Sequence, residues 1–213
     1  MKLYHYVHCP FCVRVRLGFG FLGTKYESIV TAYDDEETPV KLTGKKMLPI
    51  VVYDDGKAQN ESLDIIKAQD TNNLLGWDAL AKNLEAINPL LDKSGALVHN
   101  LAMPYWIWTP EFNESSRKYF QTKKEVKRGP FKNLVHNQKS FADDLAKLLE
   151  DELVTELRPF YKSDKFTIMD IMIAAHLWGM YVVPEFRFSE AVNNYLQKVK
   201  AIAHFNYHED YWR

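Results

Sequence analysis

The sequence has few cysteines, no excess of charge of either sign and no long hydrophobic run. Only two of its 213 residues are cysteines, so we expect none of the disulfide frameworks that small secreted proteins use. Its 27 basic and 28 acidic side chains give a net charge of -1, which offers no electrostatic reason for binding nucleic acid. No apolar run is long enough to span a bilayer. We therefore expect no nucleic-acid or membrane partner.

The remaining composition is that of a globular protein. Hydrophobic residues make up 46% and aromatic residues 14%, which is enough to build a core. The first residues, Met1 to Tyr6, lack the apolar centre of a signal peptide. From this start we expect a cytoplasmic location, where thiols stay reduced.

Both cysteines lie in one short motif, Cys9-Pro10-Phe11-Cys12. This spacing indicates either redox chemistry or metal binding. A structural zinc site needs about four ligands, and no second pair of cysteines or histidines stands nearby. The spacing therefore favours redox chemistry, and we expect no metal.

The first seventy residues predict alternating strands and helices. Short β-prone runs alternate with apolar-periodic segments that have Pro10 at a helix start and Gly23 at its end. The order β-α-β-α-β-β-α is that of a thioredoxin-like domain. The expected strands are 2–7, 26–30, 50–53 and 57–59, and the expected helices are 10–22, 38–42 and 62–69.

The rest of the chain shows helical periodicity and no clear strand. We expect a thioredoxin-like α/β domain over 1–72, a linker over 73–80 and an all-α domain over 81–213. Thr167 and Asp170 fit a capping box that opens an apolar helix. Leu80, Leu84 and Ile87 fit one helix face, and we expect Trp77, Trp106, Trp108 and Trp178 in the core or a domain interface.

The position of the motif between a strand and a helix explains its chemistry. Cys9 falls near the helix N-cap, where free N–H groups and the helix dipole favour a thiolate. Cys12 lies one turn further along and is expected to be more buried, as a resolving thiol requires. His8 could tune the thiolate, but we expect it to be a partly exposed bystander. The G-x-G-x-x-G match from Gly18 to Gly23 lies late in this helix, so it predicts no nucleotide site.

Three sequence elements resemble a known family. Cys-Pro-Phe-Cys after an N-terminal strand is similar to the active-site motif of dithiol glutaredoxins, with Phe11 in place of tyrosine. Met47-Leu48-Pro49 before a strand and Glu61-Ser62 before a helix are similar to the glutathione-contact elements of glutaredoxins and glutathione transferases. With a helical second domain, the chain resembles the larger bacterial class called glutaredoxin 2.

The resemblance implies a glutathione-transferase-like architecture and an enzyme, a glutathione-dependent thiol–disulfide oxidoreductase. Cys9 would be the nucleophile and Cys12 the resolving thiol, with glutathione as co-substrate and disulfide-containing or glutathionylated proteins as partners. Pro49 would be cis, and the protein would be a monomer. The implied glutathione contacts are Cys9, Pro10, Phe11, Leu48, Pro49, Glu61 and Ser62, where Ser62 could also serve simply as a helix N-cap.

Two alternatives stay open at this stage. A glutathione transferase would share the fold, although its chemistry has no need of Cys12. A protein that holds an iron–sulfur cluster through Cys9 and glutathione would be a binding protein and not an enzyme.

Overall fold

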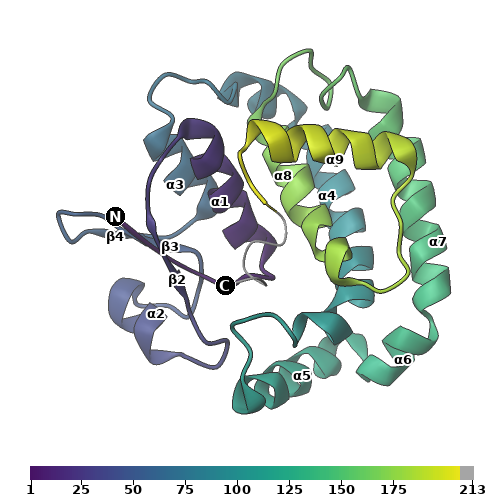
Figure 1. The fold of residues 1–213 in the computed structure, drawn as a ribbon, viewed down its shortest axis with the longest axis horizontal. Coiled ribbons are helices and arrows are strands. Elements are labelled where there is room, and N and C mark those ends of the chain that lie inside the picture. Colours follow the sequence, from purple (N-terminus) through teal and green to yellow (C-terminus); the bar gives the residue numbers. More distant parts are fainter. Residues whose placement is uncertain (207–213) are drawn as a thin grey trace.

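The computed structural model describes residues 1–206, and its first part is built on a four-stranded sheet (Figure 1). The strand order is β2-β1-β3-β4. The outer strand β2 is parallel to β1, as predicted, and the other pairs are antiparallel. The strands are β1 (Lys2–His5), β2 (Glu27–Val30), β3 (Ile50–Val52) and β4 (Ala58–Gln59).

Successive side chains of the central strands point to opposite faces of this sheet. Leu3 and Val51 join the main core, which also holds the apolar side chains of α1 (Pro10–Leu22) and α3 (Ser62–Gln69). Ile50 instead packs in a second cluster that Leu42 of α2 (Glu37–Thr43) covers. The sheet is therefore covered on both faces, as expected for the predicted α/β domain.

Helix α1 starts and ends where the sequence predicts. Pro10 occupies its first turn, and Gly23 ends it in the left-handed conformation with φ 67°. Gly20 allows close packing, because a Cβ atom there would lie 1.9 Å from the carbonyl oxygen of Ala203. The glycines of the G-x-G-x-x-G match thus serve helix packing and helix termination.

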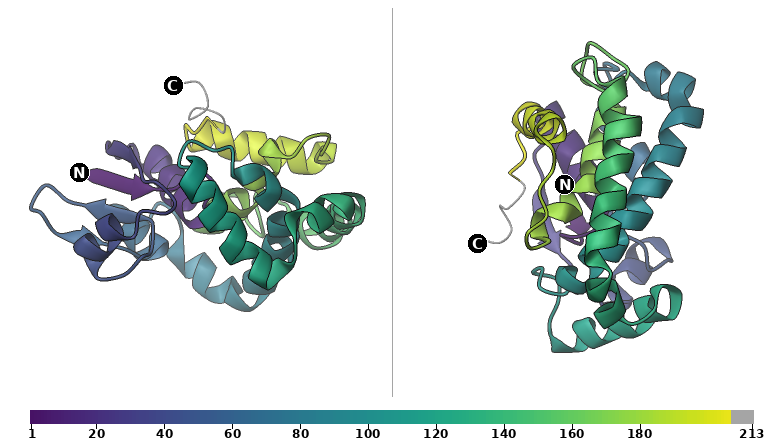
Figure 2. Two further views of the ribbon diagram at one scale, coloured as in Figure 1. Left: turned by 90° about the horizontal axis from the view of Figure 1, so that it is seen from below. Right: turned by 90° about the vertical axis from the view of Figure 1, so that its right-hand side faces the viewer.

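The rest of the described chain is helical, as predicted. Helix α1 packs against α8 at the centre of the molecule, and α4 and α7 run side by side (Figures 1 and 2). The helices are α4 (Trp77–Trp106), α5 (Glu114–Arg128), α6 (Phe131–His136), α7 (Gln138–Leu148), α8 (Ile168–Leu177) and α9 (Glu190–Ile202), with short π or 3-10 segments η1 (Leu149–Leu153), η2 (Val154–Glu156) and η3 (Trp178–Val182). No described helix is long and apolar enough to cross a membrane. The last residues of the expected all-α domain, 207–213, lie outside the described part of the chain.

The connection between the two parts is shorter than the expected linker 73–80, because α4 already begins at Trp77. Asp70 organises this connection. Its carboxylate accepts hydrogen bonds from the backbone N–H groups of Leu74 (2.8 Å) and Leu75 (2.9 Å) and from the Trp77 indole (2.9 Å). The last residues of the expected linker, 77–80, belong to helix α4.

Helix α8 is the buried helix of the second part, and the predicted capping box opens it. The Thr167 hydroxyl accepts from the Met169 N–H, and Asp170 accepts from the Thr167 N–H at 2.8 Å. The other Asp170 oxygen accepts from the Tyr161 N–H and the Tyr195 hydroxyl, both at 2.9 Å. Burial raises the pKa of Asp170, and these donors oppose that rise.

The helical core differs from the prediction at Trp108, and the apolar face of α4 is only partly buried. Leu80 and Ile87 are buried, but Leu84 between them is 43% exposed. Trp108 is 66% exposed and stacks under Arg117, whose guanidinium carbon lies 4.5 Å from the ring centroid. Its ring therefore lies outside the core.

Candidate active site around Cys9

The two cysteines occupy the start of α1 in different environments. Cys9 is the N-cap, with extended backbone angles, and is partly exposed. Cys12, one turn further along, is fully buried, and its sulfur accepts the N–H of Tyr6 at 3.4 Å. The expected contrast between an accessible and a buried thiol is present.

This contrast separates the acidities of the two thiols. The pKa of Cys9 is lowered from 9.0 to about 6, mainly by a hydrogen bond from the Cys12 thiol. Burial opposes this change. The charge of His8 and the backbone N–H groups of Cys12 and Phe11 lower the pKa further. Burial raises the pKa of Cys12, and its hydrogen bond to Cys9 raises it further. At neutral pH, Cys9 is therefore a thiolate and Cys12 a thiol.

His8 is buried, so the prediction of a partly exposed bystander is wrong. Its Nδ1 lies 2.5 Å from Oε1 of Glu111, and its backbone N–H donates to the same oxygen at 3.0 Å. Burial would raise the pKa of Glu111, but the hydrogen bonds and charge of His8 outweigh burial and hold this pKa below its usual value. Glu111 therefore fixes the position of His8 next to Cys9.

The Leu48-Pro49 peptide bond is cis, as the resemblance implies. Leu48 is buried and belongs to the same apolar cluster as Cys12, Tyr6 and Ile50, against which Cys9 also packs. The turn before β3 is thus placed beside both sulfur atoms.

Glu61 and Ser62 lie at the start of α3. Glu61 is exposed, has φ 70° and is itself the N-cap residue, so the alternative interpretation of Ser62 as the N-cap is wrong. The buried Ser62 hydroxyl accepts from Nη1 of Arg14 at 3.2 Å. Burial lowers the pKa of Arg14 to about 10, and the charge of Cys9 opposes this change. The Arg14 guanidinium carbon lies 5.0 Å from the centroid of the Phe11 ring. Arg14 connects the start of α3 to the cysteine motif.

A cavity of about 340 Å³ opens beside Cys9, between the two parts of the molecule. From the first part it is lined by the motif and by Leu48, and from the second by α4 and α5. Its lining residues are Tyr6, His8, Cys9, Pro10, Phe11, Tyr33, Leu48, His99, Met103, Trp106, Phe120, Lys124, Lys127 and Arg128. The reactive thiol therefore faces a chamber that the helical part completes.

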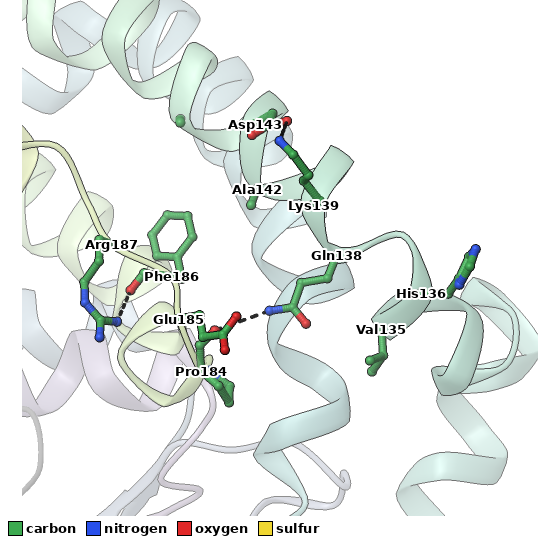
Figure 3. Close-up of a pocket in the computed structure, with 11 residues that line it drawn as sticks. Val135, His136, Gln138, Lys139, Ala142, Asp143, Pro184, Glu185, Phe186 and Arg187 are labelled. Carbon is green, nitrogen blue, oxygen red and sulfur yellow. Dashed lines mark hydrogen bonds and ion pairs between the residues drawn. The ribbon is translucent and has the colours of Figure 1, made fainter.

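A larger cavity, of about 650 Å³, lies elsewhere, between α6, α7 and the segment before α9 (Figure 3). Three of its polar side chains are bound locally: Lys139 pairs with Asp143 at 2.6 Å, and Gln138 donates to the Pro184 carbonyl at 3.4 Å. None of the predicted site residues lines it. The chemistry thus belongs to the smaller cavity.

Comparison with known proteins places this arrangement in a family. Residues 3–72 match the N-terminal domain of glutathione S-transferases, and residues 86–210 match the family described as glutaredoxin 2, C-terminal domain. Glutaredoxin 2 of Escherichia coli K12 is 32% identical over 203 residues, which cover 92% of each chain. The chain belongs to the glutaredoxin 2 family.

Solved structures agree with the glutaredoxin 2 assignment. The glutaredoxin 2 of Salmonella typhimurium, solved in complex with glutathione, has a TM-score of 0.85 at 30% identity and covers 96% of this chain and 95% of its own. A glutathione transferase from Phanerochaete chrysosporium has a TM-score of 0.71 at 16% identity, covering 96% and 97%, which shows the shared fold alone. The predicted glutathione-transferase-like architecture is confirmed.

In this member of the family the predicted site residues fall into two groups. Cys9, Pro10, Phe11 and Leu48 line the cavity, with Pro49 next to Leu48, whereas Glu61 and Ser62 lie outside it, at the start of α3. Glu111 and the α5 cations were not predicted, because no local pattern links residues after position 100 with the motif at position 9.

Proposed function

We propose that this protein is a glutathione-dependent thiol–disulfide oxidoreductase, with Cys9 as nucleophile and Cys12 as resolving thiol. The observation that carries the proposal is the separation of the two thiols, since the pKa of Cys9 is lowered to about 6 and that of the buried Cys12 is raised. A partly exposed thiolate can attack a disulfide, and a buried neutral thiol one turn away can later displace it.

The cycle on a protein disulfide starts with attack by the Cys9 thiolate on one sulfur. A mixed disulfide between Cys9 and the substrate forms, and the other substrate sulfur leaves as a thiolate. Cys12 loses its proton and attacks Cys9, which releases the reduced substrate and leaves a Cys9–Cys12 disulfide. Two glutathione molecules then reduce this disulfide and leave as oxidised glutathione.

On a glutathione mixed disulfide, Cys12 is not needed. Cys9 takes the glutathionyl group, the other thiol leaves, and a second glutathione attacks the bound glutathione sulfur to form oxidised glutathione. The fact that the related Salmonella structure holds glutathione supports this co-substrate.

The glutathione site runs from the motif to the start of α3. Its cysteinyl part would pair with the backbone of Leu48, as a peptide adds to the edge of a sheet. Its γ-glutamyl carboxylate would meet Ser62 and the α3 N-terminus, with Arg14 as supporting cation, while Glu61 takes the ammonium. Cys9, Pro10, Phe11 and Pro49 would contact the sulfur end.

We also propose protein substrates, a monomeric state and a cytoplasmic location. Disulfide-containing or glutathionylated proteins would be substrates, because Phe11 beside Cys9 is 48% exposed and accessible to a partner. The protein would act as a monomer in the cytoplasm, where glutathione keeps thiols reduced. Gel filtration with light scattering would test the monomer, and localisation of a tagged chain would test the compartment.

The experiment is glutathione-dependent reduction of a small glutathione mixed disulfide by the wild type, Cys9→Ser and Cys12→Ser. We expect full loss with Cys9→Ser and at least about half of the wild-type rate with Cys12→Ser. On a protein disulfide, Cys12→Ser should lose most activity. Normal turnover by Cys9→Ser would refute the proposal. A wild type that conjugates an aryl halide but reduces no disulfide would indicate a transferase, and a brown protein after anaerobic purification would indicate cluster binding.

A further inference from the structure

The cavity beside Cys9 has aromatic walls from both parts of the molecule. Tyr33 contacts both Tyr6 and Phe120, with ring centroids 4.9 Å apart in each pair, and Trp106 also lines the space. At about 340 Å³, the space suits a small organic group and excludes a folded chain. It lies apart from Glu61 and Ser62, where the proposed function places the γ-glutamyl end of glutathione.

Three cations line this cavity from the last turns of α5: Lys124, Lys127 and Arg128. Their spacing of three and four residues puts them on one helix face. No acidic residue lines the cavity, and no described carboxylate forms an ion pair with any of the three. Among the residues that line the cavity, the Cys9 thiolate is therefore the one anionic group that faces these three cations.

Helix α4 holds one of these cations, Arg128, in place. Arg128 donates to Oδ1 of Asn100 at 2.6 Å and to the Ala96 carbonyl at 3.2 Å, both on α4, and its Nη2 lies 3.2 Å from the His99 ring. Burial lowers the pKa of Lys124, and the neighbouring cations Lys127 and Arg128 lower it further, whereas the Cys9 thiolate raises it. A bound anion would relieve this mutual repulsion.

We infer that this cavity binds the half of a mixed disulfide that does not belong to glutathione, and that it selects a small thiol carrying an anionic group such as a carboxylate. The inference rests on the proposed function. Glutathione would lie along Leu48 and α3, and the second thiol would extend from the disulfide into the cavity. Its carbon chain would contact the aromatic walls, and its anionic group would meet the α5 cations.

The reaction step follows from this placement. The Cys9 thiolate attacks the glutathione sulfur, a Cys9–glutathione disulfide forms, and the bond to the small thiol breaks. The small thiol leaves as a thiolate into the cavity and takes a proton from water. A second glutathione thiolate then attacks the glutathione sulfur bound to Cys9, which yields oxidised glutathione and restores the Cys9 thiolate.

The test uses three mixed disulfides of glutathione that are similar in size and differ in charge. The second thiol is mercaptopropionate, mercaptoethanol or cysteamine, which is anionic, neutral or cationic. We expect the wild type to show a kcat/KM about tenfold higher for the mercaptopropionate disulfide than for the cysteamine disulfide at low salt. The ratio should shrink at high salt, because ions screen the cations.

Variants of the exposed Lys127 test whether the α5 cations cause this preference for the anionic thiol. Lys127→Gln should lower the ratio about threefold, and Lys127→Glu should lower it further. Lys118→Gln, which removes the same charge from an exposed site on α5 outside the cavity, should leave the ratio unchanged.

Three outcomes would overturn the inference. Equal turnover of all three disulfides by the wild type would refute it, while the turnover itself would uphold the proposed function. An equal rise in the KM for glutathione with all three disulfides in Lys127→Gln would assign the cations to glutathione instead. Absence of turnover of any disulfide would overturn both the inference and the proposed function.

Discussion

The imidazole of His8 and the carboxylate of Glu111 form a buried pair, 2.5 Å apart, between residues separated by 103 positions in the chain. The carboxylate belongs to the segment between α4 and α5, and the imidazole precedes the reactive thiol directly. The pair thus links the helical part to the electrostatics of the motif.

Replacement of His8 by glutamine should raise the pKa of Cys9. The amide can still donate to Glu111, but the positive charge that lowers the pKa of Cys9 is lost. If the pKa of Cys9 rises by about one unit, the thiolate fraction of Cys9 at pH 6 would fall about fivefold. The rate of alkylation of Cys9 by iodoacetamide, measured as a function of pH, gives the pKa of Cys9 in each variant. The matched control is His136→Gln, at an exposed histidine of α6, and an unchanged profile in His8→Gln would contradict the assigned role of His8.

The stability of the reduced protein should rise with pH. The pKa of Cys9 is about 6 in the folded state against an ordinary value of 9.0, so the unfolded chain binds more protons between these values. The free energy of unfolding should increase by up to about 1.4 kcal/mol for each pH unit between pH 6 and pH 9, and this gain should disappear as pH falls through 6. Urea titrations of the reduced wild type and Cys9→Ser measure the difference. Parallel pH profiles for the two proteins would show that Cys9 makes no such contribution.

Replacement of Asp170 by alanine should destabilise the fold by about 3 kcal/mol. The change removes the acceptor for the N–H groups of Tyr161 and Thr167 and for the Tyr195 hydroxyl, and all three donors are buried. Urea unfolding checks this value, with the exposed Asp164→Ala as control. A loss below about 1 kcal/mol would mean that water replaces the carboxylate.

Two glycines of α1 should respond differently to alanine. Gly20→Ala should cost about 3 kcal/mol, because its Cβ would lie 1.9 Å from the Ala203 carbonyl oxygen and backbone must move. Gly18→Ala should cost less, since its Cβ would meet a side-chain atom of Ile66 at 2.9 Å, which can shift. Thermal unfolding of both variants gives the comparison. Equal losses would show that the segment around Ala203 adjusts as easily as a side chain.

The sequence predicts those parts of the fold that local signals determine. Pro10 and Gly23 delimit α1, and Thr167 with Asp170 opens α8, because these residues act on backbone groups a few positions away. The expected linker 73–80 extends past the start of α4 at Trp77, since Asp70 organises the turn through contacts that composition does not reveal.

Features that depend on long-range packing were not predictable in this way. Leu84 follows the helical period of Leu80 and Ile87, yet no element covers it, so period alone overestimates its burial. His8 is covered by Trp106, Phe112 and Phe120, and the cavity is completed by α5, all far from the motif in the sequence. The motif identifies the reactive atoms, whereas their environment comes from the tertiary structure.

Because Glu111 lies outside the α/β part, residues 1–72 alone do not contain every residue of the active site. A chimera that joins residues 1–72 to an unrelated helical partner would inherit both cysteines and the cis-proline turn, but not the carboxylate that pairs with His8. The His8 ring would lose the partner that holds it beside Cys9, even though the motif itself is unaltered. Exchange of halves between relatives therefore has to transfer the segment around Glu111 together with the cysteines.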